Sequence, residues 1–159
     1  MALDGKRELL RHLVATVVFR GGIAILDAPE NFSVFQMDKT IRTPAELLAH
    51  IGDLLQGSHY LMKGDFVYLN STPLPWDEEV TRFFSTAKEF DSYLASDEQL
   101  HQPTEKIIQG PIADALTHIG QIVMLRRAAN APVRFANYFA VNVIPGEIDR
   151  DFFTSIKEE

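Results

Sequence analysis

The chain has 159 residues, 46% of them hydrophobic and 23% charged, and its formal net charge is −7 at pH 7. This negative balance argues against a general nucleic-acid partner, because such binding depends on Lys and Arg contacts to phosphate. The length suits a single domain over residues 1–159, and the absence of cysteine excludes both a disulfide framework and a protein thiol nucleophile.

The first predicted element is a helix over residues 5–27, whose end is blurred by Gly21 and Gly22. Scattered charge in this stretch, and the lack of a small-residue cleavage site, argue against a signal peptide. No apolar run in the chain is long enough to span a bilayer, so we expect a cytoplasmic protein outside the membrane. The apolar residues of this helix occupy more than one face, whereas a bundle interior needs one stripe. We therefore expect a homodimer in which the partner covers the surplus: Val14, Val17, Val18, Ile23, Ile25 and Leu26.

A connector leads to a second predicted helix over residues 43–63. Thr43 is placed as its N-cap, Pro44 falls at the first helical position, and Glu46 completes a capping box with Thr43. A loop rich in turn formers covers residues 64–75. A third helix, from about Pro75 to Leu94, begins with three acidic residues that complement the helix dipole. Its apolar residues recur at helical spacing: Val80, Phe83, Phe84, Ala87, Phe90 and Leu94.

The fourth predicted helix is the stretch GPIADALTHIGQIVMLRR, residues 110–127, which follows a connector broken by Pro103. It is apolar nearly all round, a pattern typical of a buried helix. Arg126 and Arg127 close it, and we expect them to compensate its dipole. Residues 131–159 are rich in aromatics and hold two prolines, so they are predicted to form an irregular tail with at most short helices. Four long helices in one chain predict an all-α four-helix bundle.

Ionisable residues interrupt two of these apolar helices. Asp114 and His118 are separated by one helical turn, which puts their β-carbons roughly 5–6 Å apart on one face, and Gln121 continues that stripe. His50 shares a stripe of the second helix with leucines, so it too is expected to point inward. Two imidazoles and a carboxylate suit zinc, nickel, iron and other divalent metals. The alternative interpretation is a hydrogen-bonded core His and a local Asp–His ion pair without a metal.

The segments TPAELLAHIGDLL (43–55) and GPIADALTHIGQIVMLRR resemble motifs of the DinB-like (YfiT-like) superfamily, which pairs a His in its second helix with a later H-x-GQ pattern. The tail segment NYF (137–139) is similar as well. This resemblance implies an up-down-down-up four-helix bundle, often a homodimer, with a nickel or zinc ion held by three ligands and open positions for water. It implies that His50 and His118 are ligands, and that Asp114 occupies a position that is most often His in the family.

The resemblance leaves the reaction open, and no residue is assigned a catalytic role. Some members of the superfamily are S-transferases or isomerases that use a low-molecular-weight thiol, so a metal-dependent hydrolase or a thiol-dependent S-transferase acting on a small molecule is one hypothesis. Gln121 is then expected to contact substrate or support a metal ligand, and the alternative is that it only bridges helices. Residues 131–146 are predicted to cover the mouth of the bundle with Tyr138 in the pocket, or else simply to cover apolar surface. The other hypothesis is a non-catalytic dimeric bundle that binds a small apolar ligand.

Overall fold

The computed structural model describes residues 4–155, and within this range all regular structure is helical and no strand occurs. The all-α prediction is thus confirmed for these residues. The buried apolar side chains form one connected core to which every long helix contributes. The elements are α1 (Gly5–Ile25), the 3-10 turn η1 (Phe32–Val34), α2 (Pro44–Lys63), α3 (Trp76–Ala95), α4 (Thr104–Ile107), the π-helical turn η2 (Ile108–Ile112), α5 (Ala113–Ala128) and α6 (Arg150–Ser155).

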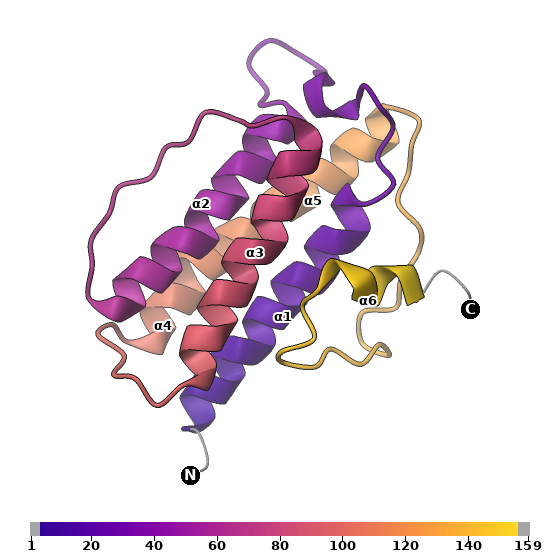
Figure 1. Cartoon of the computed structure of the whole chain (residues 1–159). Coiled ribbons are helices and arrows are strands. Elements are labelled where there is room, and N and C mark those ends of the chain that lie inside the picture. The colour runs from indigo at the N-terminus through magenta and orange to yellow at the C-terminus, as the bar shows by residue number, and fades with distance from the viewer. Residues whose placement is uncertain (1–3, 156–159) are drawn as a thin grey trace.

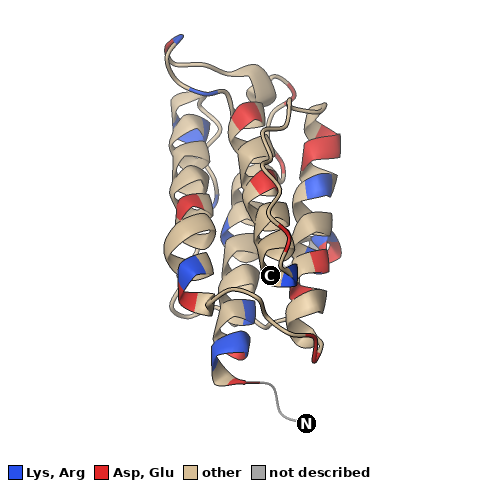
Figure 2. Ribbon diagram, turned by 90° about the vertical axis from the view of Figure 1, so that its left-hand side faces the viewer, with Lys and Arg blue, Asp and Glu red and all other residues tan. Residues whose placement is uncertain are grey.

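Helices α1, α2 and α3 lie side by side with a continuous rod made of α4, η2 and α5 (Figure 1). Helix α2 packs against α3 and α5, and α1 packs against the same two helices. Figure 2 shows basic and acidic residues interspersed over the helices rather than gathered on separate ones. No helix in the described part of the chain combines the length and the apolar character needed to cross a membrane.

The start of α2 follows the predicted capping chemistry. Thr43 Oγ1 accepts a hydrogen bond from the Glu46 backbone N–H at 3.3 Å, and Glu46 Oε2 accepts one from the Thr43 N–H at 2.7 Å. Pro44 stands at the first helical turn, where its missing N–H costs nothing. This reciprocal pair satisfies donors that the helix itself leaves unpaired, and it holds the residues before α2 against the helix that carries His50.

The connection over residues 64–75 runs along the outside of the molecule from the end of α2 to the start of α3 (Figure 1). Buried carboxylates hold it there. Asp53 on α2 accepts hydrogen bonds from the Ser71 N–H at 2.8 Å and from Ser71 Oγ at 2.7 Å, and it is also paired with Arg82 of α3. Glu79 accepts a bond from the Leu74 N–H at 3.0 Å. Polar contacts therefore order a loop whose own sequence is irregular.

Helix α1 continues through Gly21 and Gly22 to Ile25, and at both glycines a side chain of another element comes close. A β-carbon at Gly21 would stand 2.5 Å from Phe83 Cζ, and one at Gly22 would overlap the ring of Phe153. The glycine pair thus lets α3 and α6 approach α1. The local loss of helix propensity is offset by the packing that it permits.

The C-terminal segment is irregular from residue 131 until α6, as predicted, and it packs on α1. The Phe153 ring lies 6.0 Å from that of Phe19, and the Tyr138 ring lies 6.1 Å from Phe19 and 3.9 Å from Arg20 Cζ. Of the α1 residues that motivated the homodimer prediction, Val14, Val17, Val18, Ile23 and Ile25 are buried within the chain itself, and Leu26 is half-buried. Most of that surplus surface is therefore covered, and the homodimer stays a prediction.

The fourth helical rod differs from its prediction in two ways. It begins at Thr104, directly after Pro103, rather than at Gly110. Pro111 lies inside it, within the wide turn η2, because a regular helix would place the proline ring against a carbonyl one turn earlier. The rod is also not buried all round. Its solvent side is formed by small or flexible residues, namely Ala113, Thr117, Gly120, Gln121 and Met124.

Arg126 lies in the last turn of α5, as predicted, but it also has a role that was not predicted. Its side chain is buried rather than spread over the end of α5, with 5% of its surface exposed. The guanidinium donates to the carbonyls of Ala24 at 3.0 Å and Leu26 at 3.3 Å, at the end of α1, and to that of Ala131 at 2.6 Å. Arg126 therefore satisfies terminal carbonyls of a neighbouring helix and anchors the start of the tail.

Candidate metal centre

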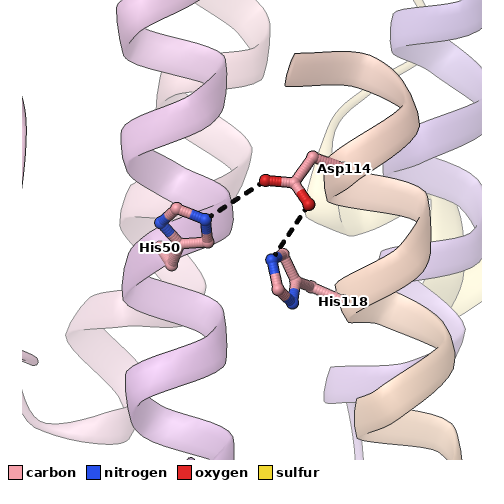
Figure 3. A group of neighbouring side chains, drawn as sticks. All are labelled: His50, Asp114 and His118. Atoms are coloured by element: carbon pink, nitrogen blue, oxygen red, sulfur yellow. Dashed lines mark hydrogen bonds and ion pairs between the residues drawn. The ribbon is translucent and has the colours of Figure 1, made fainter. Parts of the chain in front are cut away.

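Three ionisable side chains meet between α2 and α5 (Figure 3). His50 comes from α2, and Asp114 and His118 come from the first turns of α5 at positions i and i+4. The wide turn η2 ends immediately before α5, so it determines which face of that helix meets α2. The structure thus brings together the three residues that periodicity placed on the inward stripes.

The carboxylate of Asp114 lies between the two imidazoles. Its Oδ1 is 3.2 Å from His118 Nε2, and its Oδ2 is 3.4 Å from His50 Nε2. The two rings are nearly perpendicular, at 78°, with centroids 4.8 Å apart. One potential ligand atom from each residue lies within 4.8 Å of the other two. Among the described residues, this is the group of His and acidic side chains with metal-binding geometry.

These separations fit one divalent ion with small adjustment. Ligand bonds of about 2.0–2.2 Å at angles near 90–110° put neighbouring ligand atoms about 2.8–3.6 Å apart. Both carboxylate–imidazole distances lie in that range, each to a different oxygen of Asp114, and one ligand atom from each residue lies within 4.8 Å of the other two, so small movements bring the three groups to one ion. A metal ion binds the unprotonated nitrogen of an imidazole, so a proton competes with the ion at each Nε2. A bound cation takes the place of these protons, which makes binding pH-dependent.

Gln121 determines how His118 presents its nitrogens. Its Oε1 lies 2.7 Å from His118 Nδ1. An amide oxygen only accepts, so Nδ1 carries the hydrogen and Nε2 is the nitrogen that faces Asp114. Metal-binding histidines characteristically donate their second N–H in this way, which fixes the tautomer and the orientation of the ring. The structure therefore brings Gln121 to the site, as its place on the stripe predicted.

A cavity of about 620 Å³ opens beside the three side chains. Their exposed fractions are 33% for His50, 47% for Asp114 and 14% for His118, so solvent reaches the group. Leu47 and Leu125 contribute apolar wall from α2 and α5, and Met124 adds a flexible side chain. The arrangement leaves room for a small molecule next to the imidazoles and the carboxylate.

The outer wall of this cavity comes from Thr40, Ile41 and Arg42, in the connector before α2. Sequence reasoning did not assign these residues a role, although their place directly before the capped helix that carries His50 was a usable signal. Tyr138 does not line the cavity. It lies against α1 instead, over Arg20 and beside Phe19. Within the described residues, the tail thus covers apolar surface, which was the alternative considered for it.

Comparison of the chain with protein-family models, with curated proteins and with solved structures gives no match. The resemblance to the DinB-like superfamily consequently stays a prediction from the motif residues.

Proposed function

We propose that this chain is a divalent-metal-binding protein of the DinB-like type, with His50, Asp114 and His118 as the ligands of a nickel or zinc ion. The observation that carries the proposal is the convergence of these groups from two helices at distances that suit one ion. The hydrogen bond from His118 Nδ1 to Gln121 adds to it, because an ordinary surface Asp–His pair does not need a fixed tautomer.

The same proposal includes the fold of that superfamily, a four-helix bundle in up-down-down-up order. Two features support it. Helices α1 and α2 each pack against both α3 and α5, and the connection over residues 64–75 is long enough to return along the length of the molecule. Such a return is what two consecutive helices need when they run in the same direction.

We propose a catalytic rather than a purely structural centre. Three protein ligands beside a cavity leave coordination positions for water or substrate, whereas structural zinc sites are closed by four ligands. A bound ion supplies Lewis acidity and lowers the pKa of a coordinated water or thiol, which is the chemistry of a hydrolase or of a thiol-dependent S-transferase. In the chain itself, Gln121 orients the ring of His118, and the apolar side chains of Leu47 and Leu125 restrict the access of water on their side of the cavity.

A second candidate is a bundle that binds a small apolar ligand without turnover. The observation that favours it is the apolar part of the cavity wall, formed by Ile41, Leu47, Met124 and Leu125. Turnover of an electrophile in the presence of a low-molecular-weight thiol decides for the enzyme. A tightly retained apolar molecule, with metal present and no turnover, decides for the binding protein.

Elemental analysis of protein purified without a His tag tests the metal site. We expect about one nickel or zinc ion per chain. His118→Ala should lose the ion and keep its helical circular dichroism. The matched control is His12→Ala, because His12 is exposed on α1 away from the cavity. Equal metal content in the two variants would show that His118 is not a ligand.

A further inference from the structure

Arg42 lies beside the candidate metal centre and lines two cavities there. It lies in the connector, one residue before the N-cap of α2, and it lines the cavity of about 620 Å³ beside the metal-binding group. It also lines a smaller polar cavity, of about 160 Å³, which His50 shares. Among the described residues that line the larger cavity, Arg42 is the one Lys or Arg.

The guanidinium of Arg42 is available for a ligand. Within the part of the chain that the structure describes, Arg42 donates no hydrogen bond and makes no close ion pair. Its acidic neighbour, Glu46, is engaged elsewhere: Oε2 of Glu46 accepts from the Thr43 N–H at 2.7 Å and from Thr43 Oγ1 at 3.0 Å. Those bonds lower the pKa of Glu46, and Arg42 contributes to the shift only through its charge.

The net charge of the cavity also favours an anionic ligand. A divalent ion held by one carboxylate and two neutral imidazoles leaves one positive charge, and Arg42 adds a second. Among the described lining residues, Asp114 is the one acidic group, and the ion already balances it. In a chain of net charge −7, the loaded cavity is thus a local positive site. Such a concave site attracts and orients small anions.

We propose that the molecule bound in this cavity is a small carboxylate with an apolar body, and that Arg42 holds its carboxylate. The planar guanidinium donates two parallel N–H bonds, which match the two oxygens of one carboxylate. The apolar body lies on Ile41, Leu47 and Met124, next to the metal ligands. This inference rests on the proposed metal site for part of the positive charge, and on Arg42 for recognition.

Titration calorimetry with hexanoate and with its neutral amide, hexanamide, tests the proposal on the metal-loaded protein. We expect Arg42→Gln to weaken hexanoate binding by about tenfold or more, because charge-assisted hydrogen bonds are lost. Lys39→Gln is the matched control. Lys39 is exposed in the same connector and outside the cavity lining, so the same change of charge should alter affinity less than about twofold. Hexanamide should bind more weakly than hexanoate and should not respond to Arg42→Gln.

Equal hexanoate affinities in Arg42→Gln and Lys39→Gln would overturn the assignment, as would the absence of hexanoate binding in the parent protein. If hexyl phosphate bound more tightly than hexanoate, the carboxylate class would be wrong and the ligand would be a phosphate. Elemental analysis tests separately whether the protein binds a metal ion. In a metal-free protein the loss caused by Arg42→Gln should persist, because the guanidinium contacts the ligand directly, and its disappearance would refute the role of Arg42.

Discussion

The hydrogen bond between His118 and Gln121 leads to a quantitative prediction. Gln121→Ala removes the acceptor for His118 Nδ1, which lies at 2.7 Å, and leaves the ring free to change tautomer and to rotate. Removing such a partner costs about 10–100-fold in metal affinity, or about 1.4–2.7 kcal/mol. Because Gln121 is exposed and water can replace its oxygen, we expect the lower end of the range, about tenfold.

Competition titration with a chromophoric zinc chelator measures this loss. The control is Thr117→Ala, since Thr117 is exposed on the same helix and its hydroxyl bonds only to the Ala113 carbonyl. Gln121→Glu separates orientation from packing, because the carboxylate remains an acceptor and should restore affinity to at least the parental value. Equal zinc affinities in Gln121→Ala and Thr117→Ala would refute the proposed orientation of His118.

Two further predictions concern stability. Gly21→Ala should lower the free energy of unfolding by about 1–3 kcal/mol, because the new β-carbon would overlap Phe83. Gly120→Ala is the control: nothing lies within 4 Å of its new β-carbon, so it should raise the free energy of unfolding by about 0.5–1 kcal/mol. Urea denaturation that ranks the two variants the other way would contradict the packing at Gly21. Burial alone would raise the pKa of Asp53, but its hydrogen bonds hold that pKa below the ordinary 3.8, so its ionised form stabilises the fold above that pH. Asp53→Asn should therefore destabilise by about 1–3 kcal/mol at neutral pH, and the difference from the parent should narrow as pH falls through the folded-state pKa; a constant difference across a pH series would contradict this.

The helices and candidate metal ligands that were predictable from the sequence are those specified by local patterns. The capping box of Thr43 and Glu46 marks the start of α2 within a few residues, so the inward stripe containing His50 could be counted from it. Asp114 and His118 are one turn apart on the same helix, so their proximity follows from helix geometry alone. The meeting of the two helices rests on the assumption of a bundle.

Features that depend on contacts between distant segments could not be predicted in this way. Arg126 bonds to carbonyls at the end of α1, about a hundred residues earlier, so its sequence neighbours pointed only to the dipole of its own helix. Tyr138 lies in a segment without periodicity, and nothing local distinguishes α1 from the cavity as its packing partner. The exposed side of α5 was missed because three of its residues, Ala113, Gly120 and Met124, count as apolar although they tolerate solvent.

The wide turn over Ile108–Ile112 determines how α5 is rotated about its own axis, and therefore the direction in which Asp114 and His118 point. A π-helical turn takes up about one residue more than an α-helical turn, and a regular α-helix advances about 100° per residue. If the same residues formed a regular α-helix, α5 would be turned by roughly that angle, and Asp114 and His118 would face away from His50. The pairing of the two helices at the candidate metal centre thus depends on a backbone irregularity as much as on the ligands themselves.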